Sequence, residues 1–381
     1  MLNKIELYFN RGCRVQIVSL MSFLLLGGVE SALSQTWVGL GTDGNWSTAA
    51  NWDTTSPASA STTVVTLSGT TGLTSSVDTA YTVKSIVFAS GSGAFNVTGQ
   101  QISLQGTDGT LDIVNNSTTD QVINNNIKLL SNSGISTGWN TAYGTLTVNG
   151  NVDGNGKTLT FANSSTRAMT VNGIVSGASW VQIYGAGYVV LNNANTVTSG
   201  MAVSGKLIVN GSLATSANAL VIQNAGLLGG KGVINKSVTI QNGGILSAGE
   251  INASNVSQAN LLTLGSNLTL NNTSKLKFDL GTASDLVTVA GNLTLDGSLD
   301  VTAMSGFDLG SYTLFSYTGT LTDNTLDLGT MPSMGYNYSI DTSTIGLVKL
   351  NVVPEPKTWA LCLLATAVLI VARRRRVIFN L

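Results

Sequence analysis

The sequence predicts an all-β protein built as a parallel β-helix, in which short strands coil repeatedly around one core. Runs with alternating apolar and polar residues recur about every 8 to 12 residues from Val64 onward. Gly, Asn, Asp and Ser fill the intervals, where they favour turns. No segment of this region keeps a helical apolar period over three turns. A β-sandwich is the alternative, although roughly 318 residues between the terminal segments are many for one sandwich.

Several of these runs resemble one another, which favours a solenoid of stacked coils. Examples are GTLTVNGNV, GKLIVNGSL and NLTLDGSLDV. Coils stack at about 4.8 Å, so inward Leu, Ile and Val form a continuous apolar core while outward Thr, Asn and Ser face water. Leu207 is expected among the inward residues. A spacing of ~22 residues per coil predicts roughly 14 coils.

The composition excludes several classes of site. The 381-residue chain has no histidine, so it lacks the commonest general base and metal ligand. Its two cysteines, Cys13 and Cys362, lie in apolar terminal segments, and neither a cofactor nor a metal is expected. Residues 35–352 contain 10 basic and 16 acidic residues, with a single arginine, Arg167. This acidic balance argues against nucleic acid as a partner.

Residues 1–34 are predicted to be a secretory signal peptide. A start containing Lys4, Arg11 and Arg14 precedes an apolar stretch, VQIVSLMSFLLLGGV. Small residues then predict cleavage between Ser34 and Gln35, after export by the Sec machinery. A permanent N-terminal membrane anchor is the alternative.

Residues 35–70 are predicted to cap the open end of the solenoid. Trp37, Trp46 and Trp52 concentrate aromatic side chains there. They could stack on sugars, but covering the exposed strand edges is the favoured role.

The segment from Gly185 to Glu250 resembles the autotransporter-associated β-strand repeat, with GAGYVVLNNANTVTSG followed by GKLIVNG. The resemblance implies an exported, right-handed parallel β-helix. We expect the helix to cover residues 71–274, with 185–250 as the strongest repeat, and closing strands to cover 275–352. The matching residues are Gly185, Gly187, Leu191, Asn195, Thr196, Thr198, Gly200, Gly205, Leu207, Val209, Asn210 and Gly211.

The stretch 353–381 has three ordered parts. Val353, Pro354, Glu355 and Pro356 come first, and the prolines disfavour helix and keep this strip extended. Residues 358–372 are uncharged and reach about 22 Å as a helix, short for a membrane span unless flanking side chains extend it. The cluster Arg373, Arg374, Arg375 and Arg376 should then stop transfer and remain in the cytoplasm.

This three-part arrangement resembles the PEP-CTERM sorting signal. The resemblance implies recognition by an exosortase, a membrane transpeptidase of Gram-negative bacteria that make exopolysaccharide. It also implies an intermediate anchored in the inner membrane, followed by transfer to the cell surface, the outer membrane or the extracellular matrix. A plain C-terminal anchor that nothing cuts is the alternative.

The leading functional hypothesis is a structural or adhesive surface protein, with exopolysaccharide as a candidate partner. An enzyme is not expected and no catalytic residue is predicted, because most aspartates stand in turn contexts such as VDGNG and LDGSL. The alternative is a carbohydrate-active enzyme or lectin on the same scaffold, since carboxylates on adjacent coils could lie about 5 Å apart.

Overall fold

The structure, a computed structural model, describes residues 33–251, 257–332 and 335–355. Most of the predicted signal peptide, Pro356, the apolar stretch 358–372 and the four arginines lie outside these residues. Within the described residues, no helix is long and apolar enough to span a membrane.

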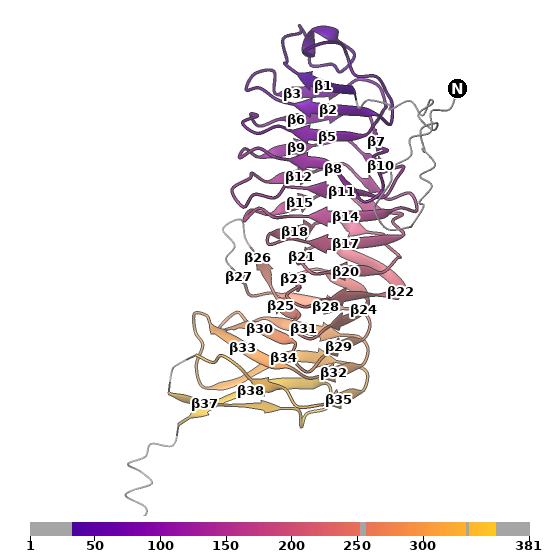
Figure 1. Cartoon of the computed structure of the whole chain (residues 1–381). Coiled ribbons are helices and arrows are strands. Elements are labelled where there is room, and N and C mark those ends of the chain that lie inside the picture. Colours follow the sequence, from indigo (N-terminus) through magenta and orange to yellow (C-terminus); the bar gives the residue numbers. More distant parts are fainter. Residues whose placement is uncertain (1–32, 252–256, 333–334, 356–381) are drawn as a thin grey trace, which may run out of the picture. The chain divides into compact units, whose positions relative to one another are not determined.

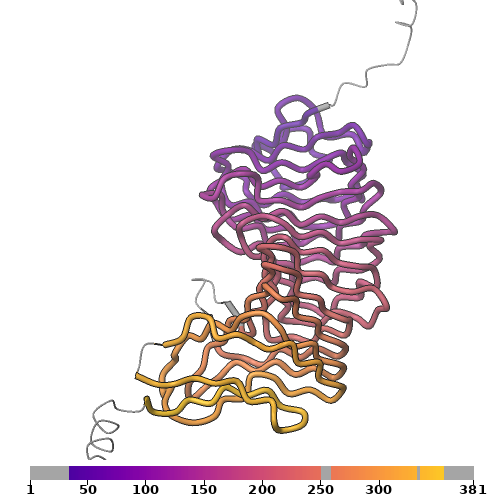
Figure 2. Tube along the Cα trace, turned by 60° about the horizontal axis from the view of Figure 1, so that its bottom comes forward, coloured from indigo at the N-terminus to yellow at the C-terminus, as the bar shows by residue number. Residues whose placement is uncertain are grey.

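Parallel strands stack in sequence order from β1 to β36, so the described part of the chain is a β solenoid (Figure 1). Its coils follow one another as closed turns in the Cα trace (Figure 2). The predicted all-β solenoid is therefore confirmed, while its right-handed sense stays a prediction. The alternative β-sandwich is wrong, because successive coils pair through parallel ladders.

Three long sheets form the faces of the solenoid within the described residues. Sheet A contains β1 (Leu33–Trp37), β2 (Thr63–Leu67), β5 (Ser85–Phe88), β8 (Thr110–Asn115), β11 (Ser133–Ser136), β14 (Thr158–Ala162), β17 (Trp180–Tyr184), β19 (Ala194–Asn195), β20 (Met201–Val203), β22 (Ser212–Ile222), β24 (Val233–Ile240), β28 (Leu261–Leu264), β29 (Leu268–Leu270), β31 (Leu286–Val289), β32 (Leu293–Leu295), β34 (Gly310–Tyr317), β35 (Leu321–Asp323), β37 (Tyr336–Asp341) and β38 (Leu347–Pro354). Sheet B contains β3 (Thr74–Val77), β6 (Asn96–Gly99), β9 (Gln121–Ile123), β12 (Leu146–Val148), β15 (Met169–Val171), β18 (Tyr188–Leu191), β21 (Lys206–Val209), β23 (Leu227–Gly230), β25 (Ile245–Ala248), β30 (Lys275–Leu280), β33 (Ser298–Ala303) and β36 (Asp327–Leu328).

The third face changes its construction along the chain. Sheet C contains β4 (Tyr81–Val83), β7 (Ile102–Leu104), β10 (Ile127–Leu129), β13 (Val152–Asp153) and β16 (Val175–Ser176). Beyond it, β22 pairs with β19 at one end and with β20 at the other, so one long strand passes from the third face onto sheet A. Outside these faces lie the hairpin of β26 (Glu250–Ile251) with β27 (Ser257–Gln258) and the 3₁₀ turn η1 (Ala49–Asn51).

Coil length varies more than the predicted spacing of ~22 residues. Leu191 pairs with Val209, 18 positions later, whereas Leu246 pairs with Leu276, 30 positions later. Sheet B contributes 12 strands among the described residues, fewer than the 14 coils expected. The estimate was too high because insertions lengthen individual coils at their corners while the paired strands stay short.

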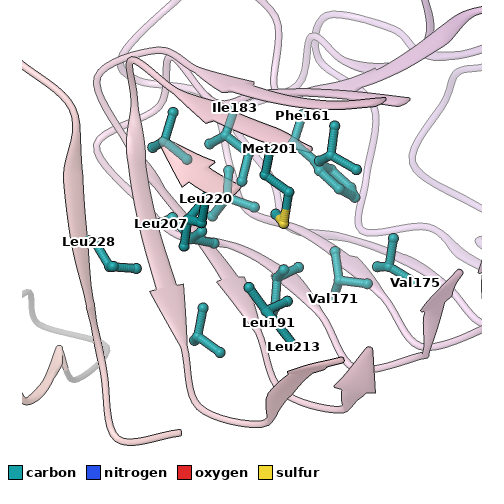
Figure 3. Packing of buried hydrophobic residues seen from close by; sticks show 14 of the residues in the cluster. Phe161, Val171, Val175, Ile183, Leu191, Met201, Leu207, Leu213, Leu220 and Leu228 are labelled. Carbon is teal, nitrogen blue, oxygen red and sulfur yellow. The ribbon is translucent and has the colours of Figure 1, made fainter. Parts of the chain in front are cut away.

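The core is a set of apolar ladders that run from coil to coil. Strand residues alternate between buried and partly exposed, as in the pattern of β12 and β15. Figure 3 shows Phe161, Ile183 and Leu220 among the side chains that fill the interior. Leu207 is fully buried and stacks on the paired Leu228, so its predicted inward position is confirmed. Burying one such side chain contributes about 1.5–3 kcal/mol.

A second ladder, formed by asparagine side chains, follows the corner after the sheet B strands from β9 to β21 and ends on Asn96, the first residue of β6. Each Nδ2 donates to the Oδ1 of the preceding coil, as from Asn149 to Asn124 at 2.7 Å and from Asn172 to Asn149 at 2.8 Å. The following coil has Gly230 and Lys231 after Gly229, with no asparagine. The asparagine ladder contains Asn96, Asn124, Asn149, Asn172, Asn192 and Asn210.

The first coil is closed by the three tryptophans that the sequence analysis singled out. Trp37, Trp46 and Trp52 are 0%, 0% and 4% exposed and pack edge to face. Each indole N–H is satisfied, with Trp37 Nε1 donating to the Gly72 carbonyl and Trp46 Nε1 to Ser75 Oγ. This packing is consistent with the predicted capping role, and burial leaves these rings no face for stacking on a sugar.

The last coil is closed by antiparallel strands. β38 pairs with β34 on one side and with β37 on the other. These pairings cover the edge of the final parallel coil with a local hairpin, since an uncovered edge would template pairing with another chain.

Three charged side chains are buried in the later coils, Lys236, Asp279 and Asp285. Lys236 is fully buried, and its Nζ donates to the carbonyls of Val197 and Ser199 at 3.0 and 2.9 Å. Burial lowers the pKa of Lys236 to about 8. Asp285 is 1% exposed and accepts from the backbone N–H of Asn260 and Asp279; burial, with a smaller contribution from the charge of Asp279, raises its pKa to about 7.

Candidate binding groove

A groove of about 370 Å³ lies on the outer face of sheet A, across β8, β11, β14 and β17. This volume falls in the range of sites for small ligands. Its lining residues come from four neighbouring coils. They are Asp108, Gly109, Thr110, Leu111, Asn132, Ser133, Thr158, Thr160, Gln182 and Tyr184.

Strand register explains why these residues meet. Thr160 pairs with Gly134 on one side and with Gln182 on the other, so one row of outward positions crosses the groove. The Leu111 side chain lies over Gly134, where a Cβ would come within 2.4 Å of Leu111 Cδ2. The glycine therefore makes room for Leu111, which lines the groove.

Aromatic rings border the groove. Tyr184 lines it, and Trp139 from the turn after β11 stacks on the Tyr184 ring with centroids 6.3 Å apart and planes at 24°. Trp139 is 75% exposed, whereas the capping tryptophans are buried. Trp180 pairs with the groove residue Thr158 and is 38% exposed; its ring lies over Gly200, where a Cβ would come within 2.2 Å of the indole.

A buried carboxylate organises the groove floor. Asp112 is 1% exposed, and its two oxygens accept hydrogen bonds from Thr110 Oγ1 at 2.5 Å and Ser133 Oγ at 2.6 Å. Burial raises the pKa of Asp112, while these two hydroxyls and the charge of Lys84 oppose the rise. Ser133 is only 3% exposed and pairs with the inward Leu159, so its hydroxyl serves the buried carboxylate.

Hydrogen bonds from backbone N–H groups to side-chain oxygens of the preceding coil fix the rim of the groove. Asp108 Oδ1 accepts from the Asn132 N–H, and Asn132 Oδ1 accepts from the Thr158 N–H, each at 2.9 Å. These bonds hold three successive coils in register at the edge of the groove. Within the described parts of the chain, no three His, Cys, Asp or Glu side chains group together as ligands for a metal ion.

The predicted processing sites lie elsewhere. Ser34 and Gln35 belong to β1, and Gln35 is largely buried and pairs with Val65. Val353 and Pro354 end β38, paired with Asn337 and Tyr336 of β37.

The start of the tail motif is open to solvent. The Val353 side chain is 49% exposed, and Glu355 is also exposed. The backbone N–H of Glu355 donates to the Gly335 carbonyl at 3.3 Å. Pro356 and Arg373–Arg376 lie outside the described residues.

The sequence analysis did not identify the groove. The alternation in WVQIY could have placed Trp180, Gln182 and Tyr184 on one outward face. It could not show that Trp139, 45 residues before Tyr184, stacks on that ring, because the contact depends on the length of the intervening coil. Most aspartates stand in turn contexts in the sequence, whereas Asp112 and Asp285 are buried within the solenoid.

The comparisons with known proteins give one partial match. No family model matches the chain. A stretch of 98 residues is 38% identical to the adhesin BmaC autotransporter of Brucella suis biovar 1 (strain 1330). The match covers 23% of this chain and 3% of that adhesin, so the chain spans a small part of its relative.

Proposed function

We propose that this chain is an exported surface protein whose solenoid serves as an adhesive or structural scaffold outside the cell. The observation that carries the proposal is the similarity to an autotransporter adhesin in a chain that folds as a parallel β solenoid. The cysteine-free segment 35–352 also suits an oxidising exterior.

The architecture supports a scaffold role because stacked coils carry similar positions at regular intervals on each face. Outward residues of the sheets are mainly small and polar, as Thr147 and Thr170 are on sheet B. Such a surface can present several weak contacts to a large partner, and their combined avidity can exceed the affinity of each contact.

Processing of the tail is part of the same proposal. Export would use the Sec machinery and pass through an inner-membrane intermediate, and an exosortase would recognise Val353–Pro356. The three-part sequence pattern supports this sorting step, and the exposed Val353 and Glu355 are placed where a processing enzyme could approach.

The alternative of a carbohydrate-active enzyme is less well supported. The groove is lined by Asp108 and has Asp112 beneath it, but both oxygens of Asp112 are bound by groove hydroxyls. A general acid or nucleophile needs an oxygen within hydrogen-bond reach of the substrate. A binding role therefore fits this floor better than turnover.

Surface exposure and attachment test the proposal directly. Intact cells that produce the full chain should lose the protein to added proteinase K, and cells lacking it should attach less to the matrix that wild-type cells colonise. A periplasmic protein should survive the same treatment, which controls for cell integrity. Protection of the full chain until cells are lysed would contradict surface location.

Sorting is tested by Glu355→Ala. This exposed side chain can be truncated with little effect on the fold, and the apolar stretch and arginines are unchanged. Full-length protein should accumulate in the inner membrane, whereas Asn337→Ala on the neighbouring strand should be processed normally. Mass spectrometry of the C-terminal peptide decides the matter, because intact VARRRRVIFNL on the surface protein would show a plain anchor.

A further inference from the structure

We propose that the groove on sheet A binds a short segment of a neutral polysaccharide, with sugar rings packed on Trp139 and Tyr184. The proposal deepens the adhesive function proposed above and rests on it for the setting in which a glycan is met.

Exposed aromatic rings beside the groove offer apolar surfaces on which a sugar ring can pack. An indole that is 75% exposed leaves a large apolar area in water, and the stack on Tyr184 holds it in one orientation beside the groove. The C–H faces of a pyranose ring are apolar and flat enough to cover such a ring. Trp180, 38% exposed and paired with the groove residue Thr158, offers a second apolar surface on the same sheet.

The polar lining supplies the complementary part. Thr158, a partly exposed lining residue of β14, offers a hydroxyl that can both donate to and accept from a sugar. The exposed amide of Gln182 can both donate and accept, and Thr160, paired with Gln182, adds a hydroxyl. Fixed hydroxyl and amide groups beside an aromatic platform match a ligand that has hydroxyls at its edge and C–H groups on its face.

Charge distinguishes neutral from acidic glycans. The groove-lining residues include Asp108 but neither Lys nor Arg, and Asp112 lies directly beneath them. A uronate or sulfated sugar would meet these carboxylates with no Lys or Arg side chain in the lining to pair with. The lining therefore favours an uncharged chain.

Dimensions favour an oligosaccharide over a single sugar. The groove crosses four parallel strands, and at about 4.8 Å per strand its length is roughly 14 Å along the solenoid. Linear chains can lie across successive coils, with one end of the bound segment at Trp139 and Tyr184.

Binding can be measured with the full-length chain in mild detergent. The probes are neutral hexose oligomers (α- and β-glucans, mannans and galactans) and an oligogalacturonate of equal length, titrated by calorimetry and tryptophan fluorescence. At least one neutral oligomer should bind at micromolar to millimolar concentration and change the emission of exposed tryptophan, while the oligogalacturonate should not.

Three variants locate the site. Trp139→Ala should weaken binding about tenfold and remove most of the fluorescence change, and Thr160→Phe should block the groove by bulk. Tyr188→Ala, on β18 of sheet B, removes a comparable aromatic ring from another face and should leave binding unchanged. Thermal melting of each variant verifies that the solenoid is intact.

The possible outcomes test the glycan groove separately from the proposed adhesive function. Absence of binding by every neutral oligomer, preference for oligogalacturonate, or equal loss in Tyr188→Ala would overturn the glycan groove. None of these results bears on protease accessibility at the cell surface, so the adhesive proposal could stand while the groove assignment falls.

Discussion

The coils formed by residues 33–211 and those formed by residues 212–355 differ in how their corners are held together. In the N-terminal coils, sheet C is separate, and the corner after sheet B is tied by the asparagine ladder. In the C-terminal coils, β22 and β24 run through a corner, so backbone ladders continue from one face to the next. Side chains tie this corner in the first region, whereas a continuous backbone carries β22 and β24 through a corner at the start of the second.

The two regions also differ in what they bury. The N-terminal coils bury mostly neutral polar groups, such as Asn115 and Asn163, which bond backbone groups of the next coil. The C-terminal coils bury Lys236 and Asp285, whose ionisation changes within an accessible pH range. Burial also raises the pKa of Asp112 in the N-terminal coils, but the larger changes in pKa are those of Lys236 and Asp285. We therefore expect pH to affect the C-terminal coils more, while apolar ladders stabilise both.

The largest expected effect comes from a charge placed in a ladder shared by the two regions. Leu207→Asp would bury an unpaired carboxylate against Leu228, the first ladder partner beyond the junction. We expect a loss of more than 4 kcal/mol, with soluble protein reduced or absent. Thermal unfolding followed by circular dichroism measures it.

Thr147→Asp is the matched control. Thr147 points outward from β12, so the same new charge remains in water and should change stability by about 0.5 kcal/mol or less. Similar losses in both variants would show that position within the solenoid, inward or outward, does not govern tolerance.

The second largest expected effect is a pH dependence of the free energy of unfolding that arises from Asp285 in the C-terminal coils. The folded pKa of Asp285, about 7, lies above its ordinary value of 3.8, so the folded state keeps this proton where the unfolded state has lost it. The associated stability is present below pH 3.8 and is lost as pH rises to about 7. At 1.36 kcal/mol per pH unit, the change amounts to a few kcal/mol.

Asp285→Asn removes the titrating group. The difference in melting temperature between wild type and this variant should change between pH 4.5 and 7.5, with wild type losing more stability as pH rises. Asp153→Asn, at the end of β13 in the N-terminal coils, should show no such difference. Parallel pH profiles for wild type and Asp285→Asn would refute the assignment.

The sequence predicted what depends on local pattern and missed what depends on coil length. Alternation in GKLIVNGSL predicted an inward Leu207, and aromatic density predicted the tryptophan cap. In the sequence, Asn149 and Asn172 could be interpreted only as turn residues. Their side-chain ladder forms because the two residues lie directly above each other on successive coils, and the sequence does not show this alignment when coils differ in length. The stack of Trp139 on Tyr184 and the burial of Asp112 depend on the same alignment, which no single repeat contains.

The smallest effect tests the corner ladder itself. Asn149 donates to Asn124 and accepts from Asn172, and all three side chains are exposed, so Asn149→Ala should cost only about 1 kcal/mol. If the ladder bonds act together, the double variant Asn149→Ala/Asn172→Ala should cost less than the sum of the two single variants, because they share a bond. Asn149→Ala combined with Thr294→Ala, on β32 in the C-terminal coils, should be additive, since the two positions share no partner. Chemical denaturation resolves these differences, and additivity in both pairs would mean that the asparagines stabilise their own turns independently and that the corner is not held by the ladder.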